Sequence, residues 1–133
     1  MKEIDEVHIP DNRRYSDDHE WVAVVGDVVR IGISDYAQDQ LGDIVFVELP
    51  KVGARIGRDS EFGVVESVKS VSDLLMPVGG EVTAVNTVLD KNPNYVNDSP
   101  YDKGWLIEVR PDSPEELNDL MIADKYIGML RGE

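Results

Sequence analysis

Short apolar runs, each closed by a turn signal, constrain this chain to a small, β-rich fold. Residues 21–25 (WVAVV) and 28–34 (VVRIGIS) flank the pair Gly26-Asp27, and such a pair between two β-runs predicts a hairpin. Short runs of this kind, bounded by glycine and proline, are typical of strands rather than of helices. Further strands are expected at residues 44–50, 61–68, 71–77, 81–89 and 105–111.

Two short helical segments are expected beside these strands. Asp35 is a candidate N-cap for a helical turn that ends at Gly42. Near the C-terminus, Ser113, Pro114 and Glu116 have the spacing of an N-cap, a first helical residue and a capping box, so a helix should begin there. Its apolar stripe should pack against the core, and a further helical turn is expected after it. The stripe consists of Leu117, Leu120 and Met121, and the further turn covers residues 124–132.

The chain is expected to form one domain, residues 15–133, behind a flexible, polar N-terminal arm, residues 1–14. A weak internal repeat aligns residues 33–35 (ISD) with residues 71–73 (VSD). Two similar β-units of this size would favour a small sandwich or flattened barrel with pseudo-two-fold symmetry.

Composition and charge exclude several classes of function. The net charge of −14 argues against nucleic-acid binding, which requires a basic surface. No apolar run approaches the roughly 20 residues that span a membrane, and the acidic N-terminus resembles neither a signal nor a transit peptide. A bacterial, cytoplasmic protein is therefore the expectation. The chain has no cysteine, so any sulfur chemistry must come from an attached cofactor.

No catalytic or metal-binding signature is present. The sequence lacks the glycine-rich phosphate loops and the Gly-x-Ser-x-Gly motif of hydrolases. His8 and His19 are the only histidines, and neither belongs to a helical pair with metal-ligand spacing. The DDHE segment, residues 17–20, could hold a metal loosely, but a solvated acidic segment before a strand is the more common arrangement. Neither a metal site nor a catalytic residue is expected.

Lys69 lies between two apolar β-arms in the stretch VVESVKSVSDLLMP, residues 64–77. Burying an ammonium without a partner is unfavourable. A hairpin that turns at residues 69–70 would leave the charge in water at the tip, with Val68 and Val71 anchoring the two strands below it. Alternation along the strand predicts two faces, one with Phe62, Val64 and Val68 and the other with Val65, Ser67 and Lys69.

An exposed turn residue without a role is the plainer interpretation of Lys69. The centre of this turn, however, has no glycine, proline, asparagine or aspartate, so something other than ordinary turn propensity specifies it. An exposed lysine on a rigid hairpin suits covalent attachment of a cofactor. A modifying enzyme can reach the amine, and amide formation removes the charge.

The segment ESVKSVSD, residues 66–73, resembles the lipoyl-attachment motif of the glycine cleavage system H protein family. The resemblance covers roughly residues 15–130 without an evident gap. The first 14 residues and the apolar run Leu74-Leu75-Met76 depart from the family pattern, and neither touches the attachment site. Other matching segments are residues 15–22, 32–53, 62–73, 80–86, 92–109 and the SPEELNDLM segment that begins at Ser113.

The resemblance implies a mostly β fold, a barrel-sandwich hybrid like that of lipoyl and biotinyl domains, with short C-terminal helices. It implies lipoate joined to Lys69 as an amide, and both sulfur atoms of the carrier would then belong to lipoate. The residues that match the motif around Lys69, and that the attaching enzyme would recognise, are Glu66, Ser67, Ser72 and Asp73.

The resemblance also implies partners and a non-catalytic role. The carrier would receive an aminomethyl group from glycine decarboxylase (P protein), give it to aminomethyltransferase (T protein), and be reoxidised by dihydrolipoyl dehydrogenase (L protein). A lipoate ligase or octanoyltransferase would modify it, and a monomer is expected. Glu20, in the segment HEW, is a candidate for the cleft that shelters the loaded arm, where an exposed carboxylate would bind the protonated nitrogen. The alternative is that Glu20 merely flanks a strand.

Other functions stay open on sequence grounds. The same attachment would serve a protein that donates lipoate to other complexes, and Lys69 would be incidental in an unmodified interaction module. A biotinyl carrier is disfavoured, because Val68 and Ser70 stand where that site has methionines.

Overall fold

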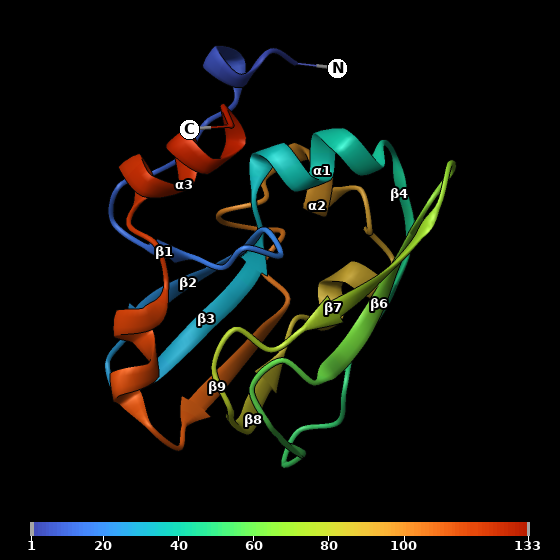
Figure 1. Cartoon of the computed structure of the whole chain (residues 1–133). Coiled ribbons are helices and arrows are strands. Elements are labelled where there is room, and N and C mark those ends of the chain that lie inside the picture. The colour runs from blue at the N-terminus through green and yellow to red at the C-terminus, as the bar shows by residue number, and fades with distance from the viewer. Residues whose placement is uncertain (1, 133) are drawn as a thin grey trace.

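The computed structural model describes residues 2–132 and contains two antiparallel sheets with the α-helices at one end (Figure 1). The strand order is β1-β2-β3-β9-β8-β5 in the six-stranded sheet and β4-β6-β7 in the three-stranded sheet. The strands are β1 (Arg14–Tyr15), β2 (Glu20–Val25), β3 (Val28–Ile33), β4 (Ile44–Glu48), β5 (Arg55–Ile56), β6 (Glu61–Ser67), β7 (Val71–Leu75), β8 (Gly80–Val85) and β9 (Ile107–Pro111). The prediction of a mostly β, sandwich-type fold is confirmed, although the sheets do not close into a barrel.

The hairpin of β2 and β3 forms as the sequence predicts. Val25 pairs with Val28 across the Gly26-Asp27 turn, and Gly26 has a φ of 65°, which glycine adopts without strain. The repeat that the sequence suggests is less regular. Ile33 ends β3, whereas Val71 begins β7, so the two aligned segments do not occupy equivalent places.

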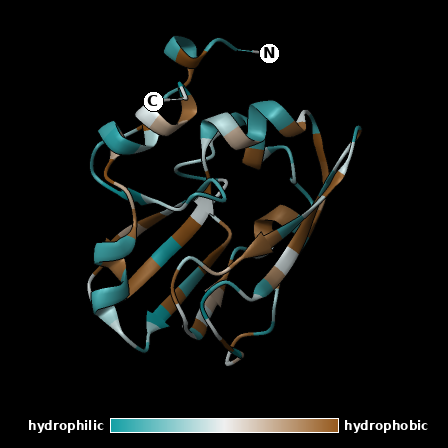
Figure 2. Cartoon of the chain, in the orientation of Figure 1, coloured by the Kyte–Doolittle hydropathy of each residue, from teal (hydrophilic) through white to brown (hydrophobic). Residues whose placement is uncertain are grey.

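The main core lies between the two sheets. Buried side chains of the six-stranded sheet, among them Val29 and Ile31, belong to one apolar cluster with Val47, Val65 and Leu74 of the three-stranded sheet. Figure 2 shows apolar residues concentrated on the strands, and polar residues along much of helix α1. Burial of one face of each sheet removes apolar surface from water and holds the sheets together.

A second, smaller core forms on the other side of β2. Trp21 is fully buried there, and its indole N–H donates to the carbonyl of Pro100 at 3.0 Å. Gly32 is its partner on β3, and a Cβ at that position would lie 2.6 Å from the indole ring. The rings of Tyr15 and Tyr126 stack in the same cluster, with centroids 4.6 Å apart.

The helix α1 (Asp35–Leu41) ends at Gly42 as predicted, but Asp35 is not its N-cap. The hydroxyl of Ser34 takes that place by accepting from the N–H of Ala37 at 3.1 Å. The Asp35 carboxylate instead accepts from Lys2 Nζ, His8 N–H and Gln38 Nε2, and these bonds tie residues from the N-terminal segment to α1. Flexibility of residues 1–14 stays a prediction; among these residues the structure also has a 3-10 turn, η1 (Ile4–Glu6).

The segment after Ser113 is helical as expected, but the predicted type of helix and its cap are wrong. Residues Pro114–Asp119 form a 3-10 helix, η3, and the Ser113 side chain caps nothing. The Glu116 carboxylate accepts from the N–H of Gly79 at 3.0 Å, so it fastens η3 to the turn before β8 rather than closing a capping box. The apolar stripe packs as expected, since Leu120 is buried in the main core and Leu117 lies against it.

The remaining helical elements lie in the C-terminal half, and the helical turn predicted over residues 124–132 is present as α3. None of the helices in residues 2–132 is long and apolar enough to cross a membrane. These elements are the 3-10 turn η2 (Thr87–Asp90), α2 (Tyr95–Asp98) and α3 (Ala123–Leu130).

Candidate functional site

Lys69 lies at the tip of the β6–β7 hairpin, which projects past the end of α1 (Figure 1). Val68, Lys69 and Ser70 connect the strands and are all exposed, so the predicted tip position is confirmed. The flanking valines do not anchor the strands as expected. Val68 is 68% exposed and Val71 is 65% exposed, so both present apolar surface to solvent beside the lysine.

The predicted faces of β6 are also corrected. The pairing of β6 with β7 shifts register between Glu61 and Gly63, and such a bulge changes the side to which the following residues point. Phe62 and Val65 are consequently both buried, whereas Val64 is only partly covered. The core-facing residue nearest the tip is therefore Val65 and not a neighbour of Lys69.

The side chain of Ser67 specifies the turn. Its hydroxyl oxygen accepts from the N–H groups of Lys69 and Ser70, both at 3.1 Å, and its own N–H donates to the Ser70 carbonyl at 2.8 Å. Serine side chains stabilise turns in this way without the backbone freedom of glycine. Ser67, one of the four motif residues, thus has a structural role at the hairpin that carries Lys69.

The corner between α1 and β4 supports the hairpin tip from beside it. The N–H of Val68 donates to the Asp43 carbonyl at 3.0 Å. The stem of Lys69 lies over Gly42, because a Cβ on Gly42 would come within 2.9 Å of Lys69 Cε. Gly42 also has a φ of 82°, a conformation that glycine adopts without strain. The glycine after α1 thus ends the helix and leaves space for the lysine stem.

Asn97 of α2 holds this corner in place, and no local pattern predicts that role beyond the residue's place within a matching segment. Its Oδ1 accepts from the N–H of Ile44 at 2.8 Å. Its Nδ2 donates to the Gly42 carbonyl and to Gln38 Oε1, each at 2.9 Å. A single amide therefore joins the end of α1 to the start of β4.

A cleft of about 260 Å³ lies between the start of β2, α1 and the β6–β7 hairpin. Its apolar lining includes Ile33, Leu41 and Leu74, and its polar lining includes Glu20. Ser72 and Asp73 also line the cleft, whereas Glu66 pairs with Val71 and Phe46 within the three-stranded sheet. The structure thus separates the motif residues: two line the cleft, Ser67 forms the turn, and Glu66 does neither.

Glu20 lines the cleft but is not the exposed carboxylate that was expected. Its side chain is 2% exposed, accepts from the Ser16 hydroxyl at 2.7 Å, and lies 3.5 Å from the N–H of Leu75. Burial raises the pKa of Glu20 to about 8, because the charged form loses its hydration. At neutral pH the carboxyl group is therefore mostly protonated.

His19 connects the cleft to the C-terminal helix. Its φ of 73° is unusual for a residue with a side chain, and its ring lies 5.0 Å from that of Tyr36, another cleft residue. Nδ1 of His19 lies 2.8 Å from the hydroxyl of Tyr126, which is itself 2.7 Å from the hydroxyl of Ser34. Burial lowers the pKa of His19. Helix α3 thereby fixes one wall of the cleft.

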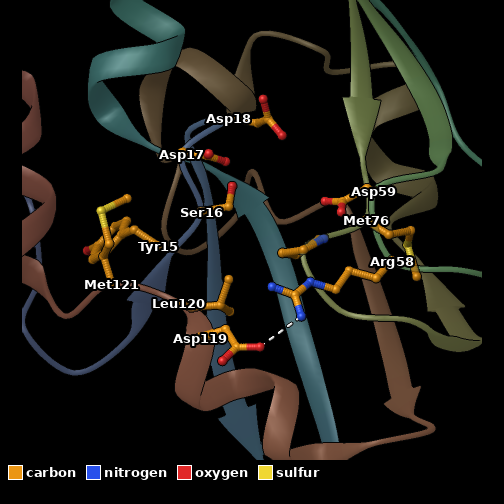
Figure 3. A pocket seen from close by; sticks show the side chains of 11 residues that line it. Tyr15, Ser16, Asp17, Asp18, Arg58, Asp59, Met76, Asp119, Leu120 and Met121 are labelled. Atoms are coloured by element: carbon orange, nitrogen blue, oxygen red, sulfur yellow. Dashed lines mark hydrogen bonds and ion pairs between the residues drawn. The ribbon is translucent and has the colours of Figure 1, made fainter.

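A second hollow, of about 230 Å³, lies next to the cleft and shares Asp18 with it (Figure 3). Arg58 extends into it and pairs with Asp119 at 2.9 Å, and Asp17 and Asp59 line the same hollow. Within residues 2–132, no group of three or more histidine, aspartate or glutamate side chains is arranged to hold a metal ion. The acidic segment 17–20 thus contributes to the walls of both hollows.

Comparison with known proteins links this geometry to one family. The family model described as "Glycine cleavage H-protein" matches residues 13–133. The glycine cleavage system H protein of Halalkalibacterium halodurans is 55% identical over 126 residues, which cover 95% of this chain and 98% of that protein. The probable glycine cleavage system H protein of Natronomonas pharaonis is 56% identical over 118 residues, 89% of this chain and 93% of that one.

A solved structure agrees with the fold. The crystal structure of a glycine cleavage system H protein from Mycobacterium marinum superposes with a TM-score of 0.83 at 38% sequence identity. The match covers 94% of this chain and 100% of the other.

Replacing Ser67 by Ala should loosen the hairpin tip while leaving the body of the fold intact. The substitution removes the acceptor for two amide groups, a loss of about 1 kcal/mol for a hydrogen bond of this kind. Hydrogen exchange at Lys69 and Ser70 should accelerate, whereas amides of β2 and β3 should not change. Ser70→Ala is the control; exchange at the tip that is equally fast in both variants would contradict the assigned role of Ser67.

Replacing Glu20 by Gln should stabilise the protein increasingly as the pH rises. Because the pKa of Glu20 is about 8 when folded and 4.5 as its ordinary value, the folded chain holds an extra proton between these limits. The free energy of unfolding therefore falls with pH there, by up to about 1.4 kcal/mol per unit. Urea unfolding at pH 5, 6.5 and 8 should show that the free energy of unfolding of the Gln variant rises with pH relative to that of the natural protein.

Glu48→Gln, at an exposed carboxylate on β4, serves as the control for that titration, because it makes the same change of side chain without removing a buried carboxyl group. A difference between Glu20→Gln and the natural protein that stays constant from pH 5 to pH 8 would contradict the raised pKa.

Proposed function

The chain belongs to the glycine cleavage H-protein family, and from this premise we propose that it is the lipoyl-bearing shuttle of glycine cleavage, with lipoate held as an amide on Nζ of Lys69. The observation that carries the assignment of Lys69 is its exposed place at the tip of a hairpin whose turn Ser67 specifies. The protein acts as a carrier and not as a catalyst. Its cargo is the aminomethyl group of glycine, taken from the P protein to the T protein.

The residues around Lys69 fit the group chemically. The amine is exposed for a modifying enzyme, and Gly42 gives the stem of the lysine room to lie along the corner. The cleft beside the hairpin offers apolar side chains for the hydrocarbon part of an arm and Glu20 for a cationic end. Lipoate supplies the dithiol, which this chain, without cysteine, cannot provide from its own residues.

Attachment changes the charge at the tip. With a lipoate ligase, the acyl carbon of the ATP-activated carboxyl group bonds to Nζ and AMP leaves. The ammonium gives up two protons as it becomes an amide N–H. The tip then carries no charge, which lowers the cost of entering the active sites of partner enzymes.

We assign Glu20 to the end of the cleft that receives the loaded arm. Burial raises the pKa of Glu20, and an ammonium group beside it would favour the carboxylate and form a charge-assisted hydrogen bond. Seating the cationic cargo would therefore release a proton from Glu20 at neutral pH. The same contact would keep the cargo away from water until a partner takes it.

The proposed partners are the P, T and L proteins, together with a lipoate ligase or octanoyltransferase. The two cleft-lining motif residues, Ser72 and Asp73, lie next to the path of the arm, whereas Glu66 remains available to the attaching enzyme. The protein is proposed to work as a monomer in the bacterial cytoplasm.

Incubation with a lipoate ligase, lipoate and ATP should add a single lipoyl group, and Lys69→Arg should abolish the addition. Intact mass measures the product, and the retained positive charge of arginine keeps the variant matched. Absence of addition to the natural protein would favour an unmodified interaction module. Glycine-dependent bicarbonate exchange with purified P protein then separates the shuttle, which supports exchange, from a lipoyl donor, which does not.

Replacing Glu20 by Gln should speed the loss of the aminomethyl group from the free, loaded carrier. The amide cannot form the charge-assisted bond, although it keeps nearly the shape of the carboxyl group. Release of ammonia or formaldehyde over time, after removal of the P protein, measures the rate. An unchanged rate in Glu20→Gln would remove Glu20 from the cleft's function and leave the role of Lys69 unaffected.

A further inference from the structure

The face of the three-stranded sheet that turns away from the core has an alternating pattern of apolar and acidic residues. One cross-strand row is Phe46, Glu66 and Val71, and the next row is Glu48, Val64 and Asp73, of which Asp73 also borders the cleft. The core-facing row between them contains Val47 and Val65, both buried. The first row therefore reads apolar, acidic, apolar, and the second reads acidic, apolar, acidic.

This outer face is uncovered. Phe46 on β4 is 48% exposed, and Val71 on β7 and Val68 at the tip are 65% and 68% exposed, with Glu66 of β6 between Phe46 and Val71. Exposed apolar side chains gathered on a small sheet often mark a binding surface, and no other phenylalanine, tyrosine or tryptophan in residues 2–132 is exposed. Within residues 2–132, none of the carboxylates of Glu48, Glu66 and Asp73 forms an ion pair with a lysine or arginine.

The position of Lys69 indicates which partner covers this face. Lys69 lies three residues after Glu66, at the hairpin tip just beyond the row of Phe46, Glu66 and Val71. An unmodified lysine reaches outward only by its four-carbon stem, so an enzyme that acylates Nζ must bring its own surface onto the flanks of the tip. Enzymes that act on the far end of a finished arm need not approach so closely.

We propose that the outer face of the three-stranded sheet, centred on Phe46, Glu66 and Val71, is the docking surface for the enzyme that acylates Lys69. The inference rests on the proposed function of Lys69 and extends it to Phe46, which lies outside the attachment motif. The partner it fits has an apolar recess for Phe46 and the valines, bordered by lysine or arginine side chains that pair with the free carboxylates. Glu66 thereby acts as a recognition residue from the centre of the face.

Two substitutions test the apolar part of the surface. Phe46→Thr and Val71→Thr keep a residue with strand propensity but remove exposed apolar area. With a purified lipoate ligase, lipoate and ATP, each variant should lower kcat/KM for the carrier roughly fivefold or more, chiefly through a higher KM, because contacts at the centre of an interface carry most of its energy. Thermal unfolding of each variant checks that the fold is retained.

Val24→Thr is the matched control. Val24 is a strand valine on β2 of the other sheet and is 66% exposed, against 65% for Val71. With the Val24→Thr carrier, kcat/KM should stay within about twofold of the value for the natural protein, because surface substitutions usually have small effects. An equal loss in Val24→Thr and Val71→Thr would overturn the proposal, and so would unchanged kinetics in both variants of the outer face.

Glu66→Gln tests the charged part. Lowering the salt concentration should strengthen the natural carrier's reaction with the ligase, because steering by unscreened charges raises association rates. The Gln variant should show a weaker dependence on salt and a higher KM. A salt dependence identical to that of the natural protein would overturn the recognition role of Glu66.

The outcomes separate this inference from the proposed function. If the natural protein is lipoylated at Lys69 and the outer-face variants are lipoylated equally well, the docking surface is wrong and the carrier function stands. If the natural protein accepts no lipoyl group, both fall together.

Discussion

The burial of one face of the three-stranded sheet against the six-stranded sheet is the interaction on which the other features depend. Val47, Val65 and Leu74 enter the shared core, and they hold β6 and β7 rigid up to the last residues before the tip. Because side chains alternate along a strand, the same burial turns Phe46, Glu66 and Val71 to solvent. One packing contact therefore provides a stiff support for Lys69 and an exposed face beside it.

Polar contacts then give the support its exact shape at the few places where the core does not reach. Ser67 closes the turn, the Asp43 carbonyl receives the N–H of Val68, and Asn97 holds the corner from the opposite side. Each bond replaces one that the same groups would make with water, so its net stabilisation is modest, about 1 kcal/mol. Their importance lies in position, because all of them converge within a few residues of Lys69.

The sequence was informative where a local pattern decides the outcome. The β2–β3 hairpin, the end of α1 at Gly42 and the tip at Lys69 follow from turn residues and from the unfavourable burial of an ammonium. It was misleading where a distant partner competes. In isolation, the carboxylate of Glu116 could close a capping box. In the folded protein it accepts a hydrogen bond from the N–H of Gly79 instead, and the segment forms a 3-10 helix. The bulge near Glu61 likewise reverses the expected burial on β6.

The candidate site was only partly predictable for the same reason. Lys69 and Ser67 lie close together in the chain, so a motif contains both. Glu20 was proposed through a resemblance, but its burial depends on Ser16 and Leu75, which approach it only in the folded protein. Asn97 has no distinguishing local pattern at all, since its partners at Gly42 and Ile44 lie far away in sequence.

The bond between His19 and Tyr126 has a consequence for the order in which the molecule matures on the ribosome. The turn at Lys69 and its supporting corner use hydrogen bonds only among residues up to Asn97, whereas the wall of the cleft at His19 requires α3. A growing chain can thus form the local contacts around Lys69 before α3 completes the wall of the cleft, while the sheet beneath the hairpin is complete only once β9 has paired. The contacts around Lys69 and the wall of the cleft therefore depend on different parts of the chain.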